Sequence, residues 1–437
     1  MPHRSGPYNG AMPIDAEKSS EQACGGRMRI ILAGEFGFPN GSGRTARVYA
    51  FAKGLSAAGC DVEVACLRPT EGTGTWAANP NASGTYRGVP FSYTGGSPYR
   101  DDTFARRRLR DLRSALRLFR LVRGTRAQGP ASVILFSHSA VWIVAAVLAC
   151  RLARSFCVLE QCEYLAARAP DSVTTRARRW YYAKTMYRLV DGVIVISTFL
   201  EEHFSARIRD DARLIRVPIL VDMDEFGEEQ TGVLADQHTL VFVGHLNHTG
   251  EIDRLLDAFF EVAPRFPEWN LRVIGGTCIP TAIEGFRERA ASSATPDRVE
   301  FVGSVERSAL PGLLRDAGAF ALPRATGLFS TAGFPTKLGE YLATGRPVVV
   351  TATGDIPLYL RDGVDAYVVP PDDTRAFAAR LADVLADPAA AKAMGARGRE
   401  TARTQFGIET QGMRLAAFMR GFGEPGTRRR ARRSTAD

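Results

Sequence analysis

Two charged residues three positions apart, Lys337 and Glu340 in the segment FPTKLGEY, have types and spacing that suit either a ligand-binding site or an ion pair. If this segment begins a helix, both side chains lie on one face. A carboxylate can accept two hydrogen bonds from a ribose diol, and an ammonium group can neutralise a diphosphate. The same spacing suits a surface ion pair, which would stabilise the helix by only about 0.2–0.5 kcal/mol. We favour the binding interpretation.

A second candidate site is a glycine-rich loop between a predicted strand and a predicted helix near the start of the chain. Glycine lets a phosphate approach the backbone, and a helix start offers free N–H groups and the positive end of the helix dipole. Gly41, Ser42 and Gly43 are therefore predicted to contact a phosphate or an acceptor, meaning a substrate that receives a transferred group. A plain turn into a packed helix would suit them too. The spacing is not GxGxxG, which argues against a dinucleotide dehydrogenase.

Three further polar residues follow predicted strands. His138 follows the strand predicted over 132–136, where it would face a ligand, and an imidazole can accept or relay a proton. A buried, hydrogen-bonded histidine is the other interpretation. Glu160 and Glu163 follow the strand predicted over 155–159, and one of them is expected to contact an acceptor, unless both lie in a solvated loop.

The elements that would position these residues form two similar halves. Strands alternate with helices along 28–221 and again along 239–405, which predicts an α/β fold with two Rossmann-like, doubly wound parallel-sheet domains that face a cleft. The acidic stretch 222–238 lacks periodicity and is the predicted linker. The remaining segments are a disordered leader, a C-terminal helix that can cross back to the first domain, and a basic disordered tail, at 1–27, 406–423 and 424–437.

Composition agrees with this organisation. A chain of 437 residues is long enough for two domains of roughly 200 residues each. The net charge of +9 suggests an anionic partner, which could be a phosphate-bearing substrate, an acidic membrane or nucleic acid.

Seven scattered cysteines without a CxxC pair favour reduced thiols and a cytoplasmic location over disulfides or a zinc site. The apolar stretch 131–150 has a polar centre, which predicts a strand, a turn and a buried helix rather than a membrane span.

The stretch 106–126 contains nine arginines, and five of them recur at helical spacing beside an apolar stripe of Leu109, Leu112, Leu116 and Phe119. Such a helix could lie on an anionic membrane surface. The alternative is a solvated basic face above a stripe that packs into the core, and the sequence does not decide between them. Arg176, Arg178 and Arg179, beside Trp180, Tyr181 and Tyr182, extend the membrane hypothesis.

Several segments resemble the retaining GT-B glycosyltransferases of the family 4 type (glycosyl transferases group 1). The opening MRIILAGEFGFPNGSGRTARVYAF is similar to that family's first strand, glycine-rich loop and helix. DGVIVISTFLEEHF and LVFVGHLNHTGEIDRLLDAFFEV resemble the end of its first domain and the start of its second. The most specific resemblance is VEFVGSVERSALPGLLRDAGAFALP followed by GFPTKLGEYLATGRPVVVT. Together they extend over most of 28–405.

The resemblance implies an enzyme that transfers a sugar from a nucleotide-diphosphate sugar to an unknown acceptor with retention of anomeric configuration. It implies no cofactor besides this co-substrate, and we expect no metal because the six histidines are dispersed. His138 would lie near the donor sugar, and Glu340 would bind the nucleotide ribose. The residues that we predict to bind the donor nucleotide are Gly244, His245, Arg324, Gly333, Lys337, Leu338 and Glu340.

The sequence departs from the family pattern in the donor domain. Ala332 stands where the family often has a second glutamate, and His245 and Thr249 stand roughly where an Arg and a Lys grip the diphosphate. Lys337 and Arg324 are the predicted replacements for that positive charge. The backbone of the loop 327–333 is a further predicted contact for the sugar and phosphates.

The expected partners are a nucleotide-sugar donor and an acceptor that is lipid-linked or an envelope glycan, with the protein peripheral at the inner face of the membrane. Nucleic acid is not expected, because no recognised module interleaves aromatic and basic residues. Two alternatives remain open: a nucleotide-sugar epimerase on the same architecture, and a nucleotide-sugar-binding homologue with weak catalysis.

Overall fold

The computed structural model describes residues 27–41, 43–72, 77–125, 128–164, 172–226, 238–247, 249–277 and 279–422. The predicted leader up to residue 26, Ser42, most of the predicted linker and the predicted basic tail lie outside the described residues.

The first domain is built on a sheet of eight described strands in the order β3-β4-β2-β1-β5-β6-β7-β8, parallel except between β3 and β4. The strands are β1 (Arg29–Gly34), β2 (Asp61–Cys66), β3 (Ser83–Tyr86), β4 (Val89–Tyr93), β5 (Ser132–Phe136), β6 (Cys157–Gln161), β7 (Gly192–Val195) and β8 (Arg213–Arg216). The helices are α1 (Gly43–Ala57), α2 (Phe104–Arg123), α3 (Ala140–Ala153), α4 (Val173–Lys184) and α5 (Thr198–Ser205).

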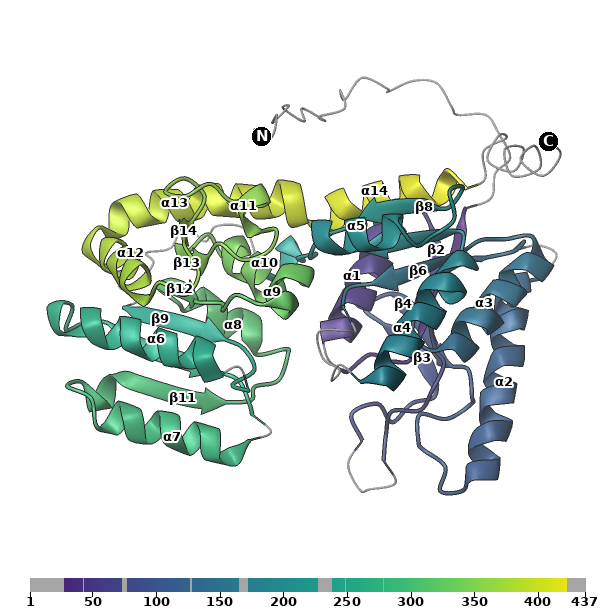
Figure 1. Ribbon diagram of the computed structural model, residues 1–437, viewed down its shortest axis with the longest axis horizontal. Helices are drawn as coiled ribbons and strands as arrows, with labels where there is room; N and C mark the ends of the chain where they lie inside the picture. Colours follow the sequence, from purple (N-terminus) through teal and green to yellow (C-terminus); the bar gives the residue numbers. More distant parts are fainter. Residues whose placement is uncertain are drawn as a thin grey trace, which may run out of the picture.

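The second domain has a parallel sheet of six described strands in the order β11-β10-β9-β12-β13-β14 (Figure 1). The strands are β9 (Thr239–Val243), β10 (Asn270–Ile274), β11 (Val299–Gly303), β12 (Ala319–Leu322), β13 (Val348–Thr351) and β14 (Tyr367–Val369). The helices are α6 (Thr249–Val262), α7 (Pro280–Ala291), α8 (Leu310–Arg315), α9 (Leu328–Ala332), α10 (Thr336–Ala343), α11 (Ile356–Tyr359), α12 (Thr374–Ala386) and α13 (Pro388–Thr401).

The local sequence explains these elements. Strands β5 (SVILF) and β7 (GVIV) are apolar or small at nearly every position and entirely buried, as parallel strands between two helical layers must be. Helix α6 is amphipathic, with Ile252, Leu255, Leu256 and Phe259 at helical spacing, and these four side chains are completely buried. The predicted fold class, two Rossmann-like parallel-sheet domains, is confirmed.

The chain crosses between the domains twice, and the two crossing segments run side by side. The Val221 N–H donates to the Phe406 carbonyl (2.8 Å), and the Ile408 N–H donates to the Val221 carbonyl (3.1 Å). Directly beyond, α14 (Ile408–Arg420) packs along α1 of the first domain (Figure 1). The last described helix therefore belongs to the first domain's core, although it follows the second domain in sequence.

Helices α1 and α14 touch at two glycines. A Cβ atom at Gly412 would lie 2.4 Å from the carbonyl group of Gly54, and a Cβ atom at Gly54 would lie 2.6 Å from the Ile408 carbonyl oxygen. Side chains do not fit at such distances, so only glycine allows the two backbones to approach this closely. The contact carries Leu415 and Met419 of α14 into the apolar core of the first domain.

Replacing Gly412 by alanine is expected to lower the thermal unfolding midpoint. Alanine is favoured over glycine inside a helix by about 1 kcal/mol, but here the clash with Gly54 should outweigh that gain, since overpacking typically costs about 1–3 kcal/mol. The control is Gly285→Ala in α7, where the added Cβ would have no atom within 4 Å and stability should rise. Scanning fluorimetry of both variants measures the difference, and a raised midpoint in Gly412→Ala would contradict the close contact.

Candidate active site

The segment that contains Lys337 and Glu340 begins helix α10, and Glu340 is held by two cations. The Lys337 Nζ atom lies 3.1 Å from Glu340 Oε2, so the two side chains share one face of the helix as expected from their spacing. From the loop after β11, Arg307 Nη1 lies 3.1 Å from Glu340 Oε1. Both carboxylate oxygens of Glu340 therefore have a positively charged partner, and its side chain is only 12% exposed.

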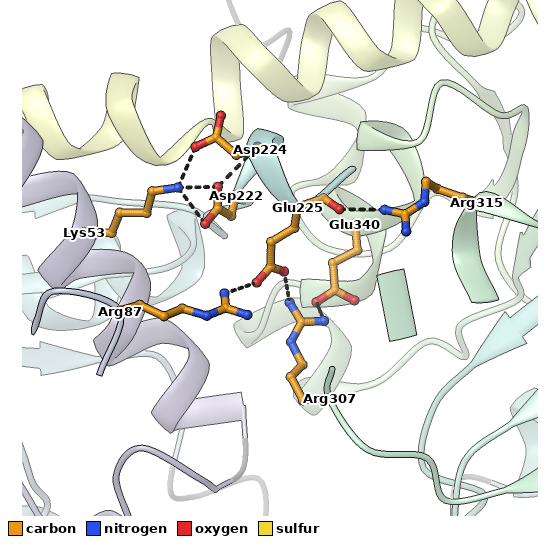
Figure 2. A network of polar contacts seen from close by, with 8 residues as sticks. All are labelled: Lys53, Arg87, Asp222, Asp224, Glu225, Arg307, Arg315 and Glu340. Carbon is orange, nitrogen blue, oxygen red and sulfur yellow. Dashed lines mark hydrogen bonds and ion pairs between the residues drawn. The ribbon is translucent and has the colours of Figure 1, made fainter. Parts of the chain in front are cut away.

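Glu340 lies at the boundary between the domains. The adjacent Gly339 is so close to the first crossing segment that an added Cβ atom would lie 2.8 Å from Ile219 Cδ1. Glu225, in the 3-10 turn that continues this segment, binds Arg307 Nη2 through Oε2 at 2.9 Å (Figure 2). Its other oxygen lies 2.7 Å from Arg87 Nη1 of the first domain. Charged groups of both domains and of the linker thus meet beside Glu340.

A second ion-pair group on the linker anchors it to α1. Lys53 Nζ lies 2.7 Å from Asp222 and 2.6 Å from Asp224 (Figure 2). Burial alone would lower the pKa of Lys53, but the bonds to these two carboxylates outweigh it and raise the pKa above its ordinary value. The two aspartates, which the sequence analysis did not consider as a pair, are occupied by this ammonium group.

The domains also touch through the start of α5. The Thr198 N–H donates to Asp355 Oδ2 of the second domain (2.8 Å), and Arg216 Nη1 lies 3.3 Å from the same oxygen. Ser197 Oγ donates to the Ala332 carbonyl oxygen at 2.6 Å. Ala332, at the position where the resembled family often has a glutamate, is buried in this contact and offers no polar side chain.

The other predicted donor-site residues range from exposed to completely buried. The Gly244 N–H donates to the Ile274 carbonyl (3.0 Å) directly after β9, and His245 beside it is exposed. Gly333 uses its N–H within its own turn, bonding to the Phe329 carbonyl at 3.1 Å. Leu338 is completely buried, so its side chain belongs to the core. The side chain of Thr249 lies outside the part that the structure describes.

Arg324, two residues beyond β12, is deeply buried. It is 6% exposed, and its Nη1 atom has no hydrogen-bond partner among the described residues. Burial lowers the pKa of this guanidinium, while the carboxylate of Glu251 in the first turn of α6 acts in the opposite direction. A buried guanidinium nitrogen without a hydrogen bond is costly, so an anionic ligand near the start of α6 would relieve that cost.

In the first domain, His138 lies beyond the carboxyl end of β5, as predicted. Its carbonyl oxygen accepts a hydrogen bond from Tyr182 Oη at 2.8 Å, which fixes the loop. The preceding Ser137 donates to Glu35 Oε2 at 2.7 Å, and Arg68 Nη1 lies 3.0 Å from Glu35 Oε1. The sequence analysis missed Glu35, although this residue directly follows the first predicted strand and the argument used for His138 applies to it.

The glycine-rich loop is a compact turn into α1. A Cβ atom at Gly41 would lie 2.1 Å from Thr45 Oγ1, which itself donates to the Gly37 carbonyl at 2.7 Å. Gly43 is the first residue of α1, and an added Cβ there would meet nothing within 4 Å. Gly41 is therefore required by the turn, whereas Gly43 leaves open space at the helix start. Ser42 lies outside the described residues.

The prediction that Glu160 lies in a loop beyond its strand is wrong. Glu160 is inside β6, 3% exposed, and its Oε1 atom lies 2.6 Å from Arg47 Nε. Arg47 also donates to the carbonyl oxygens of Pro218 (2.7 Å) and Val217 (2.9 Å). A buried guanidinium requires such partners, which makes Glu160 a structural residue. Glu163, half-buried after the strand, keeps the position expected of it.

The three leucines of the α2 stripe face outward, so the alternative that the stripe packs into the core is wrong for them, whereas Phe119 packs against the core. Leu109, Leu112 and Leu116 are 53–68% exposed, and Phe119 is half-buried. The buried positions of the helix are Arg110, Ser114, Leu118 and Val122. A groove of about 1220 Å³ runs along the helix, lined by these leucines and by arginines that include Arg113 and Arg117.

Helices α3 and α4 also expose apolar side chains. The prediction of a buried helix within 131–150 is only half right, because α3 buries one face and exposes Val141, Val144, Leu148 and Leu152. On α4, Trp180 and Tyr181 are exposed, whereas Tyr182 is buried and bonds to the His138 loop. The side chains of Arg178 and Arg179 lie outside the described part.

Within the described ranges, no three His, Cys, Asp or Glu side chains come together as a metal-binding group. The same ranges contain no helix with the length and apolar character needed to span a membrane.

Two family models match the chain, one for each domain. A "Glycosyl transferase 4-like domain" matches residues 42–219, and "Glycosyl transferases group 1" matches residues 224–401. The fold of two parallel-sheet α/β domains agrees with this class of protein. The chain belongs to the GT-B glycosyltransferases of the family 4 type.

Individual relatives match only part of the chain, at about 30% identity. The chain is 30% identical over 243 residues to the GDP-mannose-dependent alpha-(1-6)-phosphatidylinositol monomannoside mannosyltransferase of Mycolicibacterium smegmatis, covering 53% of this chain and 62% of that protein. It is 29% identical over 182 residues to the D-inositol 3-phosphate glycosyltransferase of Corynebacterium efficiens, covering 41% of this chain and 42% of that protein. The matches thus span less than two thirds of either relative.

Solved structures share the fold at low identity. HepE of Anabaena in complex with UDP superimposes with a TM-score of 0.65 and 14% identity, covering 90% of this chain and 100% of that one. Sucrose-phosphate synthase of Thermosynechococcus elongatus gives a TM-score of 0.66 and 19% identity, covering 91% and 99%.

Replacing Glu160 by glutamine is expected to destabilise the first domain by about 3 kcal/mol, because it leaves Arg47 buried without its carboxylate. Denaturant unfolding should show a lower midpoint. Glu163→Gln, three positions away and half-buried, is the control and should change the midpoint much less. A Glu160→Gln protein of unchanged stability would restore Glu160 as a candidate acceptor contact.

Proposed function

We propose that this chain is a glycosyltransferase that moves a sugar from a nucleotide-diphosphate sugar in the second domain to an acceptor at the first, with retention of anomeric configuration. The observation that carries the proposal is the position of Glu340, whose carboxylate is fixed at the domain boundary by Lys337 and Arg307. A carboxylate held in this way suits the two hydroxyls of a nucleotide ribose. The family models over both domains support the same chemistry.

In this proposal, Lys337 and Arg324 supply the positive charge for the diphosphate. Negative charge grows on the leaving nucleotide as the glycosidic bond breaks, and cations already in place stabilise it without reorganisation. Arg324 supports this role because its buried Nη1 atom lacks a hydrogen bond among the described residues. No metal ion is required for this step, and metal-independent transfer is part of the proposal.

The acceptor side of the proposed site is the carboxyl edge of the first sheet, at Glu35 and His138. Both residues follow neighbouring parallel strands, β1 and β5, whose carboxyl ends lie at the same edge. The hydrogen bond between Ser137 and Glu35 ties the two loops together. An acceptor hydroxyl that enters here would find a carboxylate and an imidazole, either of which can take or relay its proton.

We further propose that the acceptor is presented at an anionic membrane surface, with the protein peripheral at its cytoplasmic face. The exposed leucines of α2 alternate with arginines, and α3 and α4 add further exposed apolar side chains. Apolar side chains that enter the interface and arginines that pair with anionic headgroups together favour such binding. The M. smegmatis relative, by its name, acts on a phosphatidylinositol mannoside, which supports a lipid-linked acceptor here.

A second candidate function is a nucleotide-sugar-binding homologue with weak catalysis. The observation that favours it is Ala332, which is buried against Ser197 and supplies no carboxylate to orient a donor sugar. Such a protein would bind nucleoside diphosphates and release no transfer product in the presence of candidate acceptors.

Replacing Glu340 by alanine should weaken binding of nucleoside diphosphates by at least about tenfold, because two hydrogen bonds to a charged group are lost. Calorimetry with UDP and GDP measures the affinity, after a thermal-shift screen has identified the nucleotide that raises the melting temperature. Glu261→Ala, on the exposed side of α6, is the control and should leave the affinity unchanged. Equal affinities of Glu340→Ala and the unmutated protein would refute the site.

The membrane proposal predicts that the protein sediments with vesicles containing phosphatidylglycerol and not with phosphatidylcholine vesicles, and that binding fades as salt is raised. Changing Leu109 and Leu112 together to serine should remove most of the binding. The control is Leu358→Ser, an equally exposed leucine on α11 of the second domain. If the unmutated protein stays in the supernatant at low salt, the proposal fails.

A further inference from the structure

One guanidinium group connects the donor site to the linker. Arg307 bonds through Nη1 to Glu340 Oε1 at 3.1 Å and through Nη2 to Glu225 Oε2 at 2.9 Å (Figure 2). The nitrogens of a guanidinium group lie in one rigid plane, so engaging two of them fixes the two carboxylates relative to each other. Arg307 therefore relates the position of Glu340 to the position of the linker.

Glu225 is itself anchored and can serve as the fixed end of this connection. Arg87 Nη1 lies 2.7 Å from its second carboxylate oxygen, and Arg315 Nη1 donates to its carbonyl oxygen at 2.9 Å. The guanidinium of Arg87 lies over the ring of Tyr49 in α1, 5.7 Å from its centroid, which holds it against the first domain. Residues of both domains therefore hold Glu225 in position.

The bond from Arg307 does not block Glu340 from a ligand. A carboxylate offers about four acceptor positions, and Arg307 and Lys337 account for one on each oxygen. The remaining positions can accept the two hydroxyls of a ribose. A glutamate side chain that is already fixed loses less conformational freedom when the ligand binds, so fixing it raises affinity.

We propose that Arg307 is a positioning residue for Glu340, and that through it the linker residue Glu225 sets the affinity for the nucleotide. The inference rests on the proposed role of Glu340 as the ribose-binding residue. Glu225 contributes to nucleotide binding only through Arg307, and a change in the placement of the two domains alters donor affinity by shifting this connection.

The test is a double-mutant cycle on nucleotide affinity, measured with UDP, GDP, dTDP and ADP as probes. Arg307→Gln and Glu225→Gln should each weaken binding of the preferred nucleotide by about threefold to tenfold, and the double variant should be no weaker than Arg307→Gln alone. In a Glu340→Ala background, neither change should have any further effect. Arg307→Lys should give an intermediate loss, because an ammonium group can hold one carboxylate but not align two.

The matched control is Arg272→Gln, which removes an arginine–glutamate pair with Glu300 between β10 and β11 of the second domain and involves neither the linker nor Glu340. Its affinity should equal that of the unmutated protein. The Arg307 side chain is about half exposed, so its replacement should leave the melting temperature nearly unchanged. Measuring that temperature for each variant separates a loss of affinity from a loss of folding.

The outcomes distinguish the two proposals. If the unmutated protein binds none of the four nucleotides, or if Glu340→Ala binds normally, the proposed function of this site fails and the inference fails with it. If Glu340→Ala loses affinity while Arg307→Gln and Glu225→Gln do not, the ribose site stands and the positioning role is overturned. Additive losses in the Arg307–Glu225 double variant, or an equal loss in Arg272→Gln, would also overturn it.

Discussion

The buried guanidinium of Arg47 fixes where the first domain ends. It binds Glu160 inside the sheet and the two carbonyl oxygens at 217–218, where the chain leaves the domain. Because a buried charge must keep its partners, α1, β6 and the departing chain behave as one rigid unit. Ile219 follows immediately and packs against Gly339 of α10. The same constraint therefore places the donor-site helix, and with it the charged groups at the domain boundary.

The fold and the general location of the site could be predicted because their signals are local in the sequence. Apolar strands alternate with amphipathic helices in both halves, and Lys337 lies within one helical turn of Glu340. The pair between Arg47 and Glu160 could not be foreseen, because 113 positions separate the partners and nothing nearby marks Glu160 as buried. For the same reason, sequence reasoning did not find Arg307 at Glu340, since only the folded second domain brings that loop to α10.

The orientation of α2 shows a different limit of sequence patterns. The helix has two stripes of similar length. The stripe that faces inward buries Leu118 and Val122, and its two polar residues, Arg110 and Ser114, have specific partners. Ser114 donates to the Leu67 carbonyl at 2.9 Å, and Arg110 donates to the Tyr99 carbonyl at 2.6 Å. These carbonyl groups belong to loops beside the sheet, so the residue pattern of the helix alone does not predict the hydrogen bonds to them. The sequence therefore left the inward face of α2 undecided, and these contacts show which face it is.

The position of α14 affects the order in which the protein can become stable during synthesis. Ribosomes complete the first sheet early, yet Leu415 and Met419, which close its core, emerge only after the whole second domain has been made. Until then, α1 and the adjoining strands would present uncovered apolar surface, the kind of surface that chaperones bind and that promotes aggregation. The amino-terminal half should therefore be a poor candidate for expression by itself. A chain that retains α14 can bury the apolar surface of α1 and the adjoining strands.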